Sequence, residues 1–496
     1  MTSQTIEIPT ALGTVRGSLR GESASFLGIP YAQPPVGERR FAAPVPFGPW
    51  EGVLDATEHG ATPQRTALAE VTLIPEPTVP GPSTLNLNVF APVDADFGSK
   101  LPVLVWIHGG GFVAGSPASP WYDGAGFNRD GVVTVSISYR LGFDGFGWIE
   151  DAPHNRGILD WMLALQWVQD HIASFGGDPS RVTIAGQSAG GGAVLTLLAT
   201  KGAEKLFARG YSISGAAADI PLEKAEAAGR ELAGKAGVEP NIAGFSSLRE
   251  EQILSLQGGV GLEADPDASD PMAPMVALVT GGLTFGPVID GQLLTDTVEN
   301  LLRNGAGADK PLVLGSTDHE FNMAMAQHEA PLAGVDPVPL LSRFGASPEL
   351  IEEYRAQHAG LSTAGLLGQF ITDSMFRVKT LQYAQARDEA GAPAFLYRFS
   401  WQSPTIGGAC HCLDVPFFFD CLADSHVAHI AGPNPPQELA DELHSEAVGL
   451  IVNGAPGWGA YTADSPMVRV YNTPSTTADN GYSDVALLQP AATPAN

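Results

Sequence analysis

Residues 182–192 read VTIAGQSAGGG, an apolar segment that runs into a serine flanked by small residues. The five residues from Gly186 to Gly190 match the pattern G-x-S-x-G, and an alanine- and leucine-rich stretch follows them. This order predicts a buried strand, a sharp turn and a helix, with the hydroxyl of Ser188 raised at the turn. A purely structural glycine-rich turn would give the same pattern, so the motif alone leaves the role of Ser188 open.

A second motif lies earlier in the chain, directly after another apolar strand. Residues 102–112 read PVLVWIHGGGF, in which His108 precedes three glycines. Such a loop exposes backbone N–H groups that can hold a developing negative charge. A tight turn usually needs only one glycine, so the two motifs together, in this order, indicate nucleophilic catalysis.

Strand-like and helix-like patterns alternate around these motifs. Apolar or alternating segments occur at 84–92, 131–140, 310–317 and 392–401, and residues 157–175 have apolar side chains at helical spacing. This alternation predicts an α/β fold with a mainly parallel sheet and helices on both faces. We expect one domain over 1–475, with cap insertions at about 222–282 and in parts of 325–390, and a weakly ordered tail over 476–496.

Composition narrows the classes of partner. The chain has 496 residues and a net charge of −28, with 44% hydrophobic and 16% charged residues. These values describe a globular protein, and the acidity argues against nucleic acid and anionic membranes as partners. No apolar run is long enough to cross a bilayer, and the first residues lack the pattern of a signal peptide. The three cysteines, Cys410, Cys412 and Cys421, are clustered, which favours a reduced, cytoplasmic location.

A serine nucleophile needs a base and an orienting acid, which follow it in the order acid, then histidine. The strand-like segment ending in GSTDHE offers Asp318 and Glu320, and the later loop GGACHC contains His411. Three further histidines compete with His411 for the role of base: His426, His429 and His444. The residues by themselves do not choose among these candidates.

The chain resembles the type-B carboxylesterases, a family that includes bacterial p-nitrobenzyl esterases and animal cholinesterases. The resemblance covers nearly the whole chain and is carried by FLGIPYAQPPVGERRF, LNLNVFAP, VWIHGGGF, FGGDPSRVTIAGQSAG and GACHCLDVPFFF. It implies the α/β-hydrolase fold, with Ser188 as nucleophile, Glu320 as acid and His411 as base. It also implies that the backbone N–H groups of Gly110, Gly111 and Ala189 bind the oxyanion.

The implied activity is hydrolysis of small to medium carboxylic esters, aryl and xenobiotic esters among them, through an acyl-enzyme. No metal or organic cofactor is expected. The chain is expected to be a monomer, and the only expected partner is its ester substrate. A carbamate or amide hydrolase with the same residues is an alternative. A non-catalytic binding homologue is a second alternative, but the serine, acid, histidine and glycine loop are all present.

Three positions depart from the family pattern, and two cysteines raise a separate question. Gln187 stands where the family often has glutamate, which removes a charge but leaves the turn intact. Thr84 replaces the first cysteine of an early disulfide, as expected of an intracellular bacterial member. Trp161 stands where glutamine is usual, without a reason visible in the sequence. Cys410 and Cys412 flank His411, but neighbours in an extended segment point to opposite faces, so a metal site there is disfavoured.

Overall fold

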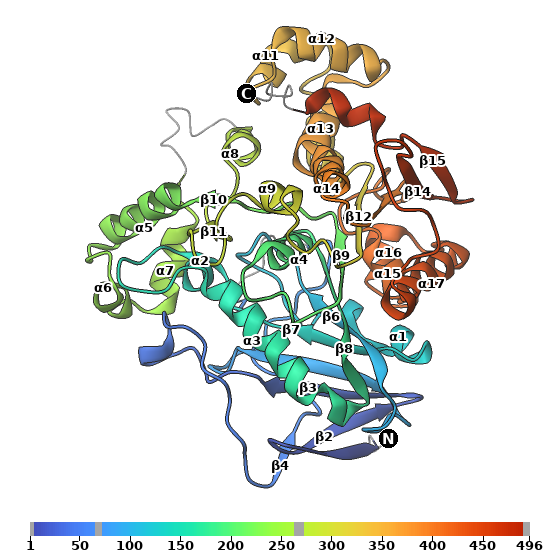
Figure 1. Cartoon of the computed structure of the whole chain (residues 1–496). Coiled ribbons are helices and arrows are strands. Elements are labelled where there is room, and N and C mark those ends of the chain that lie inside the picture. The colour runs from blue at the N-terminus through green and yellow to red at the C-terminus, as the bar shows by residue number, and fades with distance from the viewer. Residues whose placement is uncertain (1–3, 65–71, 262–271, 490–496) are drawn as a thin grey trace.

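The computed structural model in Figure 1 describes residues 4–64, 72–261 and 272–489. Parts of two expected segments lie outside these residues: the middle of the cap at 222–282 and the end of the tail at 476–496. Within the described residues, no helix is long and apolar enough to cross a bilayer.

A single large sheet runs through the molecule in the order β1-β2-β3-β5-β7-β6-β8-β9-β12-β13-β14-β15, with β4 beside β2. Its strands are β1 (Thr5–Thr10), β2 (Gly13–Arg20), β3 (Ser23–Pro30), β4 (Val53–Asp55), β5 (Asn86–Pro92), β6 (Leu101–Ile107), β7 (Val133–Ile137), β8 (Gly177–Gln187), β9 (Arg209–Ile213), β12 (Leu312–Thr317), β13 (Ala394–Phe399), β14 (Met467–Tyr471) and β15 (Thr476–Asp479). Two further strands, β10 (Ile220–Pro221) and β11 (Val288–Ile289), form a separate parallel pair. From β7 to β14 every neighbouring pair is parallel, whereas the pairs from β1 to β7 and the β14–β15 pair are antiparallel. The short strand β4 pairs parallel with β2. The expected mainly parallel sheet is therefore confirmed.

Helices connect and cover these strands. They are α1 (Ala125–Arg129), α2 (Gly142–Phe146), α3 (Arg156–His171), α4 (Ala189–Ala199), α5 (Leu222–Ala236), α6 (Ile242–Ser246), α7 (Glu250–Gln257), α8 (Ala273–Gly281), α9 (Val298–Arg303), α10 (Asn322–Ala326), α11 (Pro337–Ser342), α12 (Pro348–Gln357), α13 (Thr363–Thr372), α14 (Val378–Glu389), α15 (Val415–Phe418), α16 (Val427–Ala431) and α17 (Gln437–Asn453). Short turns of other helix types are η1 (Gly37–Arg39), η2 (Pro120–Tyr122), η3 (Ile172–Phe175), the π-helix η4 (Asp373–Arg377) and η5 (Ser483–Leu488).

The central strands are buried on both faces, which explains why they read as continuous apolar runs. Along β6, Val103, Val105 and Ile107 point into the core formed with α3 and α4. Leu104 and Trp106 point to the opposite face, into the core formed with α15 and α17. Figure 1 shows α3 and α4 in front of the central strands and α15, α16 and α17 grouped beside them. This period-two alternation gives each face its own hydrophobic core.

The helical middle of the chain has two parts with different surroundings. Helices α5 to α8 fall in the segment expected to form a cap, and Figure 1 places α8 away from the sheet. In the second expected insertion, α10 to α13 pack with one another, but α14 packs against β12 and β13. The last helix of that insertion therefore covers the sheet.

The tail expected over 476–496 is not weakly ordered at its start. Residues 476–479 form β15, which pairs antiparallel with β14. Tyr482 is buried, and its hydroxyl donates to the carbonyl of Tyr397 at 2.7 Å. These contacts join residues far apart in the chain, so the local lack of periodicity gave no sign of them.

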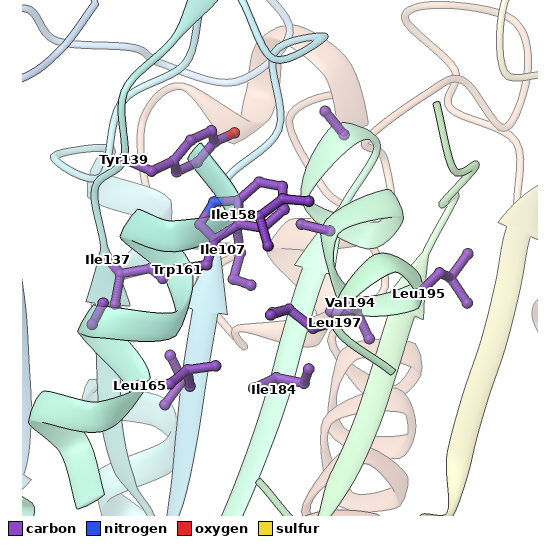
Figure 2. Close-up of a cluster of buried hydrophobic side chains, with 14 of the residues drawn as sticks. Ile107, Ile137, Tyr139, Ile158, Trp161, Leu165, Ile184, Val194, Leu195 and Leu197 are labelled. Atoms are coloured by element: carbon purple, nitrogen blue, oxygen red, sulfur yellow. The ribbon is translucent and has the colours of Figure 1, made fainter. Parts of the chain in front are cut away.

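Trp161 on α3 occupies the centre of the core beneath the turn that follows β8. It is fully buried, with ring centroids 5.3 Å from Tyr139 and 6.0 Å from Phe112, the residue after the three glycines. Figure 2 shows Trp161 between Ile158 and Tyr139, facing side chains of β6, β8 and α4. The unexpected tryptophan thus fills the space that supports the glycine loop from below.

Replacing Trp161 by alanine is expected to lower the free energy of unfolding by about 3–5 kcal/mol, because the lost ring leaves a cavity in a closed core. Urea unfolding followed by circular dichroism measures this change. The matched control is Phe97→Ala, at a side chain that is 74% exposed, for which a change within about 0.5 kcal/mol is expected. Equal losses in the two variants would contradict this account of the core.

Candidate active site

Ser188 occupies the turn between β8 and α4, as the G-x-S-x-G pattern predicts. Its backbone has φ 58° and ψ −122°, a conformation that non-glycine residues rarely adopt. The N–H of Ser188 donates to the carbonyl of Ile213 on β9 at 2.8 Å. The strained residue is therefore fixed by the sheet, and its side chain is only half-buried.

The glycines on either side of Ser188 are required by close backbone contacts. A Cβ atom on Gly190 would collide with the carbonyl oxygen of Ile107 at the end of β6. A Cβ atom on Gly186 would lie 2.5 Å from the carbonyl carbon of Gly190. Any side chain at either position would push α4 away from the sheet, so these glycines allow the sharp turn to form.

The glycine loop after β6 lies against this turn. A Cβ atom on Gly109 would be 3.2 Å from the Cβ of Ser188 and 2.7 Å from the carbonyl oxygen of Gln187. Gly110 and Gly111 have φ angles of 111° and 60°, which favour glycine. In the described part of the chain, no hydrogen-bond acceptor engages the N–H of Gly110 or Gly111. The loop thus brings free donors close to Ser188.

Ala189 is the first residue of α4. The N–H groups in the first turn of a helix have no acceptor within the helix, and the N–H of Ala189 is one of them. Helix N-termini favour negative charge. Together with the glycine loop, this end of α4 is suited to stabilise an oxyanion on an atom bound to Ser188.

His108 supports the loop from one side. Burial lowers the pKa of His108 to about 4, so its ring is neutral near pH 7. One ring nitrogen, Nδ1, is 2.8 Å from the carbonyl oxygen of Gly109, and the ring stacks on Tyr139 at 4.6 Å. The hydroxyl of Tyr139 donates to the carbonyl of His108 at 2.9 Å. His108 therefore shapes the loop and is not available as a base.

Glu320 and His411 form a buried pair. The Nδ1 atom of His411 lies 2.5 Å from Oε2 of Glu320, and Glu320 is completely buried. The other carboxylate oxygen accepts the N–H of Thr317, at the end of β12, at 2.8 Å. The N–H of His411 also donates to the carbonyl of Glu320 at 3.0 Å. The carboxylate is thus held from the sheet and fixes the orientation of the imidazole.

The second ring nitrogen of His411 points to the turn after β8. Nε2 lies 3.1 Å from Nε2 of Gln187, the residue before Ser188. Within the described residues, the hydroxyl of Ser188 has no hydrogen bond to His411 or to another group. The structure therefore brings the imidazole to the serine turn and places it in contact with the neighbouring amide.

The competing candidates have other partners. Asp318 forms an ion pair with Arg398 at 2.9 Å. Burial alone would raise the pKa of Asp318, but the charges of Arg398 and Arg377 outweigh burial and keep this pKa below its ordinary value. His444 is buried against Asp130 and the carbonyl of Phe418. His426 and His429 are exposed, 6.3 Å apart, on α16 and its cap.

Two aromatic rings enclose the imidazole. Phe321 and Phe376 have ring centroids 5.2 Å and 5.0 Å from that of His411. Phe376 belongs to the π-helix η4, where Arg377 pairs with Asp373 and Asp484. Nothing in the local sequence marks residues 373–377 as neighbours of His411, so the sequence analysis missed them.

A third carboxyl group lies behind the pair. Asp414 is buried three residues after His411, and one of its oxygens accepts the hydroxyl of Tyr397 at 2.9 Å. Burial, with the charge of Glu320 as a smaller cause, raises the pKa of Asp414 to about 7. Its other oxygen has no partner among the described residues. The local sequence could have indicated this group, because Asp414 stands directly between apolar Leu413 and the apolar run VPFFF.

The cysteines beside His411 are unpaired. Cys410 and Cys412 are buried, and burial raises the pKa of the Cys410 thiol to about 12, so that thiol is neutral near pH 7. Among residues 4–64, 72–261 and 272–489, no group of three or more His, Cys, Asp or Glu side chains is placed to hold a metal ion.

A cavity of about 250 Å³ borders the glycine loop at Val113. Its wall includes the ion pair of Arg40 with Asp144, in which nitrogen and oxygen are 2.7 Å apart. Ser188, Glu320 and His411 are not part of its lining. The cavity therefore flanks the loop and does not contain the cluster described above.

Comparison with known proteins extends this picture. A family model described as the carboxylesterase family matches residues 3–429. The para-nitrobenzyl esterase of Bacillus subtilis is 31% identical over 495 residues, which cover 96% of this chain and 97% of that protein. Human carboxylesterase 3 is 31% identical over 425 residues, with 79% of this chain and 71% of that protein covered.

Solved structures show the same similarity in three dimensions. A carboxylesterase of Geobacillus stearothermophilus superimposes with a TM-score of 0.83 at 32% identity, and the match covers 97% of this chain and 100% of that chain. A structure of PNB esterase superimposes with a TM-score of 0.78 at 29% identity, covering 96% of this chain and 98% of that chain. The fold of this chain is therefore the α/β-hydrolase fold of these enzymes.

The raised pKa of Asp414 predicts how stability changes with pH. The pKa of about 7 in the folded chain exceeds the ordinary value of 3.8, so the folded state binds this proton more tightly. This contribution to stability is complete below about pH 4 and is lost as the pH rises through 7. In Asp414→Asn the contribution disappears. Relative to the wild type, the free energy of unfolding of the variant should rise between pH 5 and pH 8, by at most about 1.4 kcal/mol per pH unit, and its melting temperature should rise with it.

Thermal unfolding followed by circular dichroism at four pH values tests this expectation. Asp464→Asn, at an exposed carboxylate, is the control, and its difference from the wild type should not vary with pH. If the Asp414→Asn difference is equally constant, Asp414 is ionised throughout this range and the account is wrong.

Proposed function

The chain belongs to the carboxylesterase family and is an esterase, and from this premise we propose that it cleaves its substrates with Ser188, His411 and Glu320. The observation that carries the proposal is the pair of Glu320 and His411, with 2.5 Å between Oε2 and Nδ1. The other ring nitrogen of His411, Nε2, points to the turn that presents Ser188. Serine hydrolases use a nucleophile, a base and an orienting acid in these roles, which supports the proposal.

In the proposed first step, the oxygen of Ser188 attacks the carbonyl carbon of the ester. Nε2 of His411 takes the proton from the hydroxyl, and Glu320 stabilises the resulting imidazolium and keeps the other proton on Nδ1. The negative charge that develops on the carbonyl oxygen is held by the N–H groups of Gly110, Gly111 and Ala189. Their lack of internal acceptors supports this role for the glycine loop.

The tetrahedral intermediate then collapses. The bond to the alcohol oxygen breaks, and His411 donates its proton to that oxygen, which leaves the acyl group on Ser188. A water molecule attacks the acyl carbon while His411 accepts the water's proton. The acid product leaves, and Ser188 regains a proton from His411. The proposed steps need no metal ion and no organic cofactor.

We propose small to medium esters, including aryl esters, as the substrate class. The support is the similarity to a para-nitrobenzyl esterase along nearly the full length of both chains. The aromatic rings of Phe321 and Phe376, which flank His411, add an apolar surface beside the reacting atoms. Cytoplasmic location and a monomeric state stay predictions.

Replacing Ser188 by alanine is expected to lower kcat for p-nitrophenyl butyrate by a factor of about 10⁴ to 10⁶, because the attacking oxygen is lost. A fluorophosphonate probe should label the wild type and not the variant. The control is Ser255→Ala, at an exposed serine on α7, which should keep full activity and labelling. Hydrolysis that survives in a folded Ser188→Ala protein would place the nucleophile elsewhere.

Glu320→Gln separates the two acid candidates. The amide can donate to Nδ1 and so favours the wrong tautomer of His411, and kcat is expected to fall by about 10³ to 10⁴. Asp318→Asn should reduce the melting temperature by breaking the ion pair with Arg398, while kcat falls far less. Steady-state kinetics and thermal unfolding of both variants measure this. A larger loss of kcat in Asp318→Asn would reverse the assignment.

A further inference from the structure

Gln187 lies between the glycine loop and the imidazole of His411. It is the last residue of β8, and only 1% of its surface is exposed. Its amide nitrogen is 3.1 Å from Nε2 of His411. Its amide oxygen faces the loop, where a Cβ atom on Gly109 would lie 3.0 Å from it. The amide is therefore confined between the two parts of the site that have to cooperate.

The hydrogen-bonding capacity of its neighbours determines which ring nitrogen of His411 carries a proton. The carboxylate of Glu320 only accepts hydrogen bonds, so Nδ1 of His411 carries a proton. In the neutral imidazole Nε2 then has a lone pair, and the amide nitrogen of Gln187 donates to it. The nitrogen that has to accept the proton of Ser188 is thus occupied by Gln187 in this structure.

We propose that Gln187 is a positioning residue that serves both protonation states of His411. It donates its amide N–H to the neutral ring and, after rotation of the amide, accepts the Nε2–H of the imidazolium through its oxygen. The proposal rests on the function proposed above, because it assigns His411 the role of base. It adds a second group that holds the imidazole during the proton transfer, on the side opposite Glu320.

Glutamine is the residue type that suits this role. An amide offers a donor and an acceptor in one planar group, whereas a carboxylate offers only acceptors. Glutamate at position 187 would bind the imidazolium well and the neutral ring badly. A negative charge at hydrogen-bond distance stabilises the charged ring, so less of the base would be free near neutral pH. The amide therefore extends the active range of the site toward lower pH.

Two other carboxyl groups interact with His411, and both are still present when Gln187 is changed. Glu320 contacts Nδ1, and Asp414, whose pKa is raised by burial, interacts with His411 through its charge. Phe321 and Phe376 cover the ring and carry no charge. The neighbouring thiol of Cys410 is neutral near pH 7 because burial raises its pKa. A charge introduced at position 187 therefore acts on Nε2 of His411, while the other contacts of the ring stay the same.

The pH dependence of kcat/KM for p-nitrophenyl butyrate between pH 5 and pH 9 tests the proposal. In Gln187→Glu the acid limb should move to higher pH by about 1 unit or more. Near pH 6 kcat/KM should consequently fall roughly 10-fold below the wild type, while the two proteins converge at pH 9. Gln292→Glu, the same chemical change at an exposed site, should leave the limb in place.

Gln187→Met gives a second readout, because it removes the hydrogen bond and adds no charge. It is expected to lower kcat/KM by a constant factor, roughly 2- to 10-fold, at every pH, with the acid limb unmoved. An unchanged limb in Gln187→Glu, a shift to lower pH, or an equal shift in Gln187→Met would each overturn the proposal. Labelling of the wild type by a fluorophosphonate distinguishes failure of this proposal from failure of the proposed function. If the wild type is neither labelled nor active, the proposed function itself is wrong.

Discussion

The close approach of α4 to the end of β6 is the constraint on which the rest of the site depends. The backbone at Gly190 fits against the carbonyl of Ile107 only because position 190 has no Cβ atom. This contact sets the sharp turn at Ser188, brings the glycine loop within van der Waals reach of it and directs the N-terminus of α4 at the same point. The buried rings of Trp161 and Phe112 support the arrangement from the core.

Much of this could be predicted because it is local. The strand, turn and helix around Ser188 and the loop after β6 are each one continuous stretch of sequence, where apolar patterning and glycine indicate the structure. Pairing Glu320 with His411 joins two segments 91 positions apart, and only the resemblance to a family selected them. The rings of Phe321 and Phe376 and the ordered segment 476–489 were missed, because tertiary contacts define them and no local pattern does.

The two acids that follow β12 have different partners although they are close in the sequence. Asp318 and Glu320 are two residues apart, yet the first pairs with Arg398 and the second with His411. Arg398 and Arg377 compensate the charge of Asp318 and connect it to Asp373 and Asp484. The carboxylate of Glu320 has no arginine partner among the described residues, so its charge is available to the imidazole.

The order of the strands along the chain has a consequence for synthesis. β6, β7, β8 and β9 are neighbours in the sheet, and these strands and α4 all end by residue 213, so the serine turn and the glycine loop can assemble before the later segments are translated. Glu320 and His411 are translated only later, on segments that add to the growing edge of the sheet. If the proposed assignment of Ser188 and His411 holds, a nascent chain forms the serine turn before it has a base, and it gains the base only when β13 and the loop after it have docked.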